Sequence, residues 1–98
     1  MKVFISADIE GIAGVMRPEQ CNPAHADYAA ARELMEQEVN AAIDGAFAGG
    51  ATAVTVADSH AMMQNLRADR LDGRARLVQG KPRGLSMVCL LYTSPSPR

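Results

Sequence analysis

The chain has 98 residues, a formal net charge of −1 and a hydrophobic fraction of 48%, which fits one small globular domain or part of a larger one. The near-neutral charge argues against a nucleic-acid surface and a polybasic membrane contact, and 4% aromatic residues argue against a stacking surface for bases or sugars. No apolar stretch approaches the roughly 20 residues of a membrane span, and acidic residues interrupt the N-terminus too early for a signal peptide. Cys21 and Cys89 lack C-x-x-C spacing, which favours free thiols in a reducing compartment. We therefore expect a cytoplasmic protein.

The first predicted element is a buried strand over residues 3–7. Its five residues are apolar, β-branched or aromatic, or small, and Gly11 and Gly14 follow shortly after, which favours a strand over a helix. Asp8 and Glu10 come where this strand ends. Two carboxylates at that place cost free energy unless positive charge lies between them, and a divalent cation is the simplest candidate.

A long amphipathic helix is predicted from about Asp27 to Ala48, because apolar residues recur there at steps of three and four. Asn22 and Asp27 are both candidates for its N-cap, and Gly49-Gly50 supplies a left-handed stop. The apolar stripe consists of Leu34, Met35, Val39, Ala42, Ile43, Ala46 and Phe47. The opposite face carries Arg32, Glu36, Asn40 and Asp44.

A second strand is predicted over residues 51–57, and Asp58, Ser59 and His60 follow it. Strand, helix and strand within about sixty residues make a βαβ unit, in which the two strands are parallel and end at the same edge of the sheet. The acidic pair after the first strand and His60 after the second are therefore predicted to be neighbours in space. Binding sites of open α/β sheets form at this edge.

Beyond His60 the pattern weakens, although residues 75–79 are a candidate third strand that ends at Gly80. The predicted fold class is α/β: a βαβ unit of an open, mostly parallel sheet with flanking helices, which forms an incomplete three-layer domain. Residues 1–88 make up this part of a domain. Residues 89–98 contain two prolines and are predicted to be a disordered tail.

Asp8, Glu10 and His60 are the predicted metal ligands. Hard carboxylate oxygens with an imidazole nitrogen are the ligand set of catalytic Zn²⁺ or Mn²⁺, and three protein ligands leave positions open for water. Two roles are possible for the Asp58 side chain: it orients the His60 ring, or it caps the turn that follows the strand. The capping role is slightly favoured. His25, among prolines and alanines, is expected to be an exposed or packing residue.

Three segments carry a family resemblance. S-A-D-I-E-G-I-A-G-V at 6–15, L-M-E-Q-E-V-N-A-A-I-D-G-A at 34–46 and V-A-D-S-H at 56–60 together resemble the D-aminopeptidase family of the DppA type, the zinc peptidase family M55. The resemblance covers about residues 1–88. It implies a dinuclear zinc peptidase that hydrolyses short peptides with N-terminal D-amino acids by attack of a metal-activated water, and that assembles into rings of identical subunits.

By matching position, the resemblance makes Asp8, Glu10 and His60 metal ligands, with Asp8 as the bridge between two metals. The family's other metal ligands and its catalytic histidine follow residue 88, so no catalytic residue is assigned in this chain. Under this interpretation the chain is an N-terminal piece with an unrelated tail and is inactive alone.

Two other functions stay open on the sequence. One is a non-catalytic α/β module that binds a single divalent ion or a partner subunit. The other is a Mg²⁺-dependent phosphatase or nucleotide-binding domain that uses Asp8 and Glu10. Gly11–Gly14 follows a strand but is not G-x-G-x-x-G, which weakens the nucleotide-binding reading.

Overall fold

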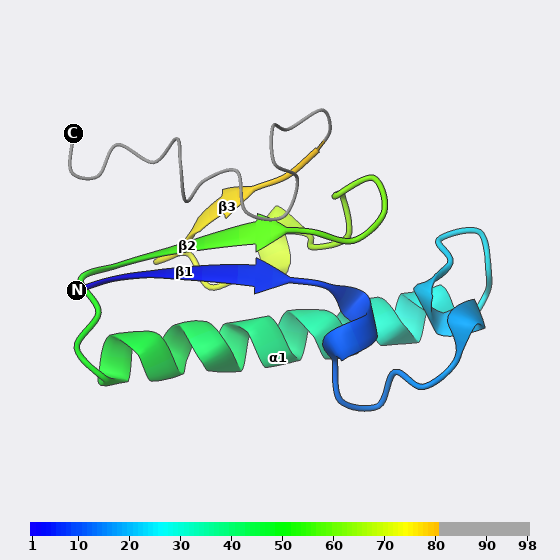
Figure 1. The fold of residues 1–98 in the computed structure, drawn as a ribbon, viewed down its shortest axis with the longest axis horizontal. Coiled ribbons are helices and arrows are strands. Elements are labelled where there is room, and N and C mark those ends of the chain that lie inside the picture. The colour runs from blue at the N-terminus through cyan, green and yellow to red at the C-terminus, as the bar shows by residue number, and fades with distance from the viewer. Residues whose placement is uncertain (81–98) are drawn as a thin grey trace.

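Three parallel strands and one long helix form residues 1–80, the part of the chain that this computed structural model describes (Figure 1). The elements are β1 (Lys2–Ala7), α1 (Tyr28–Ala48), β2 (Ala53–Asp58) and β3 (Arg76–Val78), with short 3₁₀ helices η1 (Ile9–Gly11), η2 (Pro18–Cys21) and η3 (Ala68–Arg70). The tail predicted to be disordered, residues 89–98, lies outside the described residues.

The sheet has the strand order β1-β2-β3, and both pairs are parallel. Lys2 pairs with Ala53 and Ala7 pairs with Asp58, so β1 and β2 begin and end together. The predicted α/β class, the βαβ unit and the third strand are confirmed. The arrowheads of β1 and β2 point to the same edge of the sheet (Figure 1).

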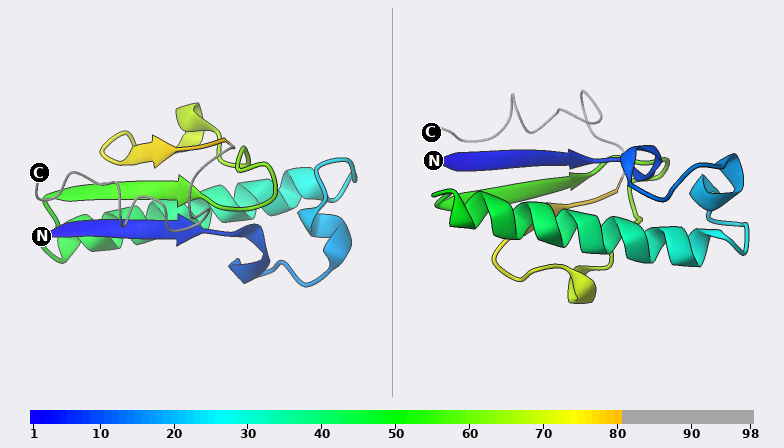
Figure 2. Two further views of the ribbon diagram at one scale, coloured as in Figure 1. Left: turned by 45° about the horizontal axis from the view of Figure 1, so that its top comes forward. Right: turned by 90° about the horizontal axis from the view of Figure 1, so that it is seen from below.

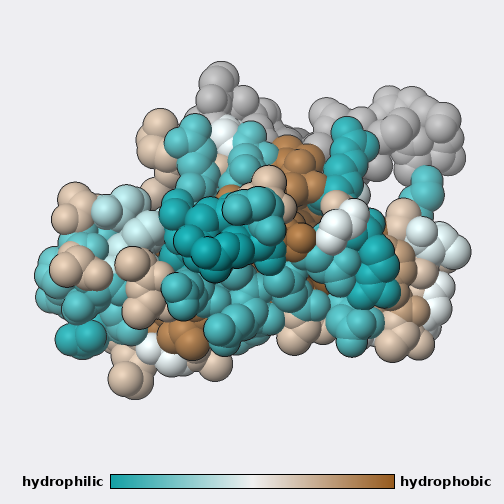
Figure 3. Space-filling model, turned by 180° about the vertical axis from the view of Figure 1, so that it is seen from behind, coloured by the Kyte–Doolittle hydropathy of each residue, from teal (hydrophilic) through white to brown (hydrophobic). Residues whose placement is uncertain are grey.

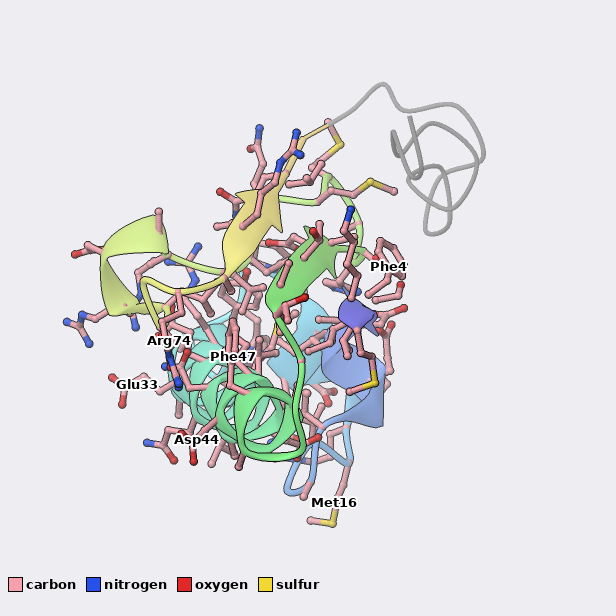
Figure 4. All side chains as sticks on the ribbon, turned by 90° about the vertical axis from the view of Figure 1, so that its left-hand side faces the viewer. Phe4, Met16, Glu33, Asp44, Phe47 and Arg74 are labelled. Atoms are coloured by element: carbon pink, nitrogen blue, oxygen red, sulfur yellow. The ribbon has the colours of Figure 1, made fainter. Side chains whose placement is uncertain are left out.

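Helix α1 covers one face of the sheet (Figure 2). Alternate strand residues face it, because side chains along a strand point to opposite faces in turn. The core between helix and sheet includes Ala7, Val54 and Val56 from the strands and Met35, Val39 and Ile43 from the helix. Phe4 lies on the side of β1 that faces away from the helix (Figure 4). No α-helix among residues 1–80 covers that second face.

The ends of α1 match the prediction in position but differ in how the first turn is capped. Asp27 is the N-cap residue, yet its side chain makes no capping hydrogen bond. The other candidate, Asn22, accepts instead from the Ala24 N–H at 2.9 Å. At the C-terminal end Gly50 has φ +108°, the left-handed conformation that glycine adopts without strain, so the predicted stop is confirmed.

The polar strip of α1, defined as Arg32, Glu36, Asn40 and Asp44, packs against the connection between β2 and β3. Each residue of the strip makes a hydrogen bond with this connection. The pairs are Arg32 with Gln64, Glu36 with Arg67, Asn40 with both Arg70 and Asp72, and Asp44 with Arg74. Figure 4 shows Arg74 beside Asp44 and Phe47, and its guanidinium lies 4.6 Å from the Phe47 ring centroid. The face opposite the apolar stripe therefore holds a chain segment in place. The face of the molecule seen from behind is largely hydrophilic and has small apolar areas (Figure 3).

Candidate metal centre

The register of β1 and β2 brings the two sequence motifs to one edge of the sheet. Because Ala7 pairs with Asp58, the residues after each strand are neighbours, and the Ser59 N–H donates to the Ala7 carbonyl at 2.8 Å. Asp8 keeps an extended conformation, and the Gly11 N–H then donates to its carbonyl at 3.0 Å. This tight turn, η1, brings Glu10 to the same place as Asp8.

Asp8, Glu10 and His60 form one cluster, in which an atom from each residue lies within 4.8 Å of the others. His60 Nδ1 is 3.1 Å from Asp8 Oδ1 and 2.9 Å from Glu10 Oε1. The His60 side chain is 11% exposed and that of Glu10 is 59% exposed, so the cluster has a buried floor and an open side. The predicted meeting of an acidic pair with an imidazole 52 residues from Asp8 is confirmed.

The two nitrogens of His60 face different partners. Nε2 lies 2.7 Å from the Cys21 carbonyl oxygen, and since a carbonyl only accepts, Nε2 carries a proton. Nδ1 then faces two carboxylate oxygens. If Nδ1 carried only its lone pair, that lone pair and the two oxygens would repel one another. Positive charge is therefore needed there, as a proton or a shared cation. A ligating imidazole typically has its other N–H held by such an oxygen, so these residues fit a divalent metal ion.

The carboxylates of Asp8 and Glu10 compete for a proton. Burial, followed by the hydrogen bond and charge of Glu10, raises the pKa of Asp8, and these effects outweigh the opposing influence of His60. The hydrogen bond from Asp8 lowers the pKa of Glu10. The raised pKa of Asp8 shows that a second negative charge is disfavoured at this place, and a bound cation would relieve that repulsion.

Asp58 acts on the loop that follows β2. It is fully buried, and its Oδ2 accepts from the Leu66 N–H at 2.7 Å and the Gln79 side chain at 3.0 Å, while its Oδ1 accepts from the Asn65 side chain at 2.8 Å. These contacts support the capping role. The sequence did not single out Asn65, because its function depends on partners that only the fold assembles.

His25 and Cys21 are not part of the cluster, although the Cys21 carbonyl contacts His60. His25 is exposed, as expected, and its Nδ1 accepts from the Asp27 N–H at 3.1 Å. Cys21 is a free thiol, also as expected. Burial, and after it the Glu10 and Asp8 carboxylates, raise the pKa of Cys21, which keeps the thiol protonated and a poor ligand. Cys89 lies outside the described residues.

A hollow of about 510 Å³ opens beside the cluster. Its lining combines charged, amide and apolar side chains, so it can hold a small molecule with one polar end next to the cluster. The lining consists of Glu10, Val15, Met16, Arg17, Pro18, Cys21 and Asn22.

No helix within residues 1–80 is long and apolar enough to span a membrane.

Comparisons with known proteins point to one family. A curated D-aminopeptidase from Bacillus subtilis (strain 168) is 38% identical over 88 residues, which cover 90% of this chain and 32% of that protein. A solved structure, described as the Zn-dependent D-aminopeptidase DppA from Bacillus subtilis, a self-compartmentalizing protease, superposes with a TM-score of 0.87 at 38% identity over the same shares. The chain thus spans about a third of the length of these relatives. The model of the M55 peptidase family, described as D-aminopeptidase, matches residues 1–96, and the chain belongs to that family.

Proposed function

We propose that this chain is the metal-binding N-terminal part of a zinc-dependent aminopeptidase that hydrolyses short peptides with N-terminal D-amino acids. The observation that carries the proposal is the cluster of Asp8, Glu10 and His60 at the carboxyl edge of the sheet. Family membership supports the peptidase class, and the structural relative is described as Zn-dependent.

Asp8, Glu10 and His60 would hold the metal, which is proposed to be zinc, with two ions in the complete site and Mn²⁺ as an alternative. When bound, the ion supplies Lewis acidity, which lowers the pKa of a coordinated water and polarises a peptide carbonyl. The chain's own residues orient the ligands: the Cys21 carbonyl holds Nε2 of His60, so that Nδ1 faces the carboxylates.

The hollow beside Glu10 is the proposed place for the N-terminal residue of the peptide. The hollow borders Glu10 and therefore lies next to the proposed metal, and the apolar side chains of Val15 and Pro18 offer a surface for the side chain of that residue of the peptide. Water is displaced from these apolar groups when a substrate enters, which favours binding.

The 98-residue chain alone is proposed to bind one metal ion and to hydrolyse little peptide. Residues 1–80 contain a single cluster of three metal-ligating side chains, and the second of the chain's two histidines, His25, is not part of it. The negative charge of these three ligands can neutralise one divalent ion but not two. A complete enzyme carrying this segment is proposed to be cytoplasmic and to form a homo-oligomeric ring, since its structural relative is described as self-compartmentalizing.

Two measurements test the proposal. Calorimetry with Zn²⁺ should give one site in the wild-type chain, lost in His60→Ala and kept in the control His25→Ala. A chimera in which residues 1–88 replace the matching segment of the Bacillus subtilis D-aminopeptidase should release D-Ala from D-Ala-D-Ala, and its His60→Ala version should not. Zinc binding without hydrolysis by the chimera would favour a non-catalytic metal-binding module, and phosphoester hydrolysis in Mg²⁺ that survives His60→Ala would favour a phosphatase.

A further inference from the structure

Asn65 is a buried amide, 2% exposed, at the end of the loop that carries His60. Its Nδ2 donates to the His60 carbonyl and to Asp58 Oδ1, both at 2.8 Å, and its backbone N–H donates to Asp58 Oδ2. Its Oδ1 accepts from the Tyr28 hydroxyl. Both amide protons and the amide oxygen are therefore used, which is the condition for a stable buried polar side chain.

The loop between β2 and Asn65 needs such a clamp because its backbone is strained. Ala61 and Met63 have φ values of +51° and +61°, in the left-handed region. This conformation costs a residue with a side chain roughly 1–2 kcal/mol, and it persists only where surrounding contacts enforce it. Asn65 ties the start of the loop, at the His60 carbonyl, to Asp58 at the end of β2.

Tyr28 fixes which way the Asn65 amide points. Tyr28 lies in the first turn of α1 and is 8% exposed, and burial is the main reason that its pKa is raised, so the hydroxyl stays protonated as a donor. Because this hydroxyl donates to Oδ1, the NH₂ group must face Asp58 and His60. The Arg32 guanidinium lies 5.3 Å from the centroid of the Tyr28 ring and helps to hold it.

We propose that Asn65 is a positioning residue for His60: with Tyr28 and Asp58 it sets the backbone of the loop so that Nδ1 of the imidazole faces Asp8 and Glu10. The inference rests on the proposed function, because metal binding by His60 is taken from there. Partners that orient a ligating histidine typically change metal affinity by roughly 10–100-fold when they are removed.

The test uses the full chain as wild type, Asn65→Ala, Tyr28→Phe and a control, Ile43→Val. Ile43 is fully buried in the core and Ile→Val costs about 0.5–1.5 kcal/mol, so this control loses stability without altering the loop's hydrogen bonds. Long-range ¹H–¹⁵N NMR of the metal-free protein reads the ring nitrogens of His60, with the exposed His25 as internal reference. Calorimetry then gives the Zn²⁺ affinity.

We expect Asn65→Ala to move the His60 ring signals toward those of His25 and to weaken zinc binding about 10–100-fold. Tyr28→Phe should move the His60 ring signals and weaken zinc binding in the same direction but by smaller amounts. Ile43→Val should change neither the ring signals nor the zinc affinity. Unchanged His60 signals in folded Asn65→Ala overturn the proposal. If Asn65→Ala does not fold, unchanged signals in Tyr28→Phe overturn it. A wild-type chain that binds no zinc would refute the metal site, while the ring signals would still decide the role of Asn65.

Discussion

At the scale of single residues, the site depends on backbone atoms as much as on side chains. The Cys21 carbonyl and the Ala7 carbonyl are both acceptors at the sheet edge, the first for the His60 ring and the second for the Ser59 N–H. Neither contact depends on the identity of the residue that supplies the oxygen. Substitution at Cys21 with a residue of similar size should therefore leave the orientation of His60 unchanged.

Ala61 gives a prediction at this scale. Its φ of +51° is unfavourable for alanine and worse for a β-branched residue, whereas glycine adopts it freely. Glycine also gains more freedom in the unfolded chain, which offsets part of the relief. Ala61→Gly should change the free energy of unfolding by less than about 1 kcal/mol, and Ala61→Val should lower it by about 1 kcal/mol or more. Urea denaturation measures both, and equal values for the two variants would contradict the left-handed conformation.

At the scale of elements, α1 holds the sheet with one face and the connection between β2 and β3 with another. Glu36, at the centre of the polar strip, is 4% exposed and accepts from Arg67 Nε at 2.8 Å and from Arg67 Nη2 at 2.7 Å. The Arg67 N–H also donates to it at 3.0 Å. A buried carboxylate with three charge-assisted or backbone bonds is stable in place, and removing its partner would leave it unpaired.

The Glu36 contacts predict a specific dependence of stability on pH. Burial raises the pKa of Glu36, but the hydrogen bonds and charge of Arg67 lower it by a larger amount. The pKa of Glu36 in the folded chain is therefore below its ordinary value of 4.5. The unfolded chain then binds the proton more tightly, and the stabilisation is complete well above pH 4.5 and is lost as the pH falls through the folded-state pKa. At pH 7, Glu36→Gln should cost about 2 kcal/mol, the order of a hydrogen bond to a charged group.

Urea denaturation at a series of pH values checks this prediction. The difference between wild type and Glu36→Gln should shrink as the pH falls below 4.5. The control is Glu19→Gln in η2, where the side chain is exposed and belongs to a different element from Glu36 and Arg67, and it should track the wild type at every pH. A constant difference between wild type and Glu36→Gln down to pH 3 would contradict the role of the Arg67 contacts.

At the scale of the whole molecule, the candidate metal centre joins segments that are distant in the chain. Asp8 and His60 are separated by 52 residues and meet only in the folded state, so an ion that bridges them binds the folded form and stabilises it. At a free Zn²⁺ concentration of about 100 times Kd, the gain is about 2.7 kcal/mol. For a domain of this size that raises Tm by about 10 °C or more.

Differential scanning fluorimetry with and without Zn²⁺ measures this shift. A chelator should reverse it, and His60→Ala should abolish it while His25→Ala should retain it. An equal rise in Tm for His60→Ala would place the stabilising ion elsewhere.

Much of this architecture could be predicted from the sequence, because it follows from local patterns. The β-branched runs at 3–7 and 51–57 and the periodic residues of 27–48 predict strand, helix and strand, and a short crossover through a helix makes the strands parallel. That topology alone brings Asp8, Glu10 and His60 to one edge. Local chemistry and chain connectivity therefore determined the elements and the cluster.

Only the tertiary structure decided which contacts hold the cluster in position. The polar strip of α1 pairs with the connection before β3, the Cys21 carbonyl accepts from His60, and Asn65 links Tyr28, Asp58 and the His60 loop. The contacts of Arg67 with Glu36, His60 with Cys21 and Tyr28 with Asn65 join residues 31 to 39 positions apart in the chain. A carbonyl or an amide has no periodicity in the sequence that reveals its partner. Their positions depend on how helix and sheet pack, because a hydrogen bond needs two atoms within about 3 Å, and a pattern of residue types does not fix distances across the fold.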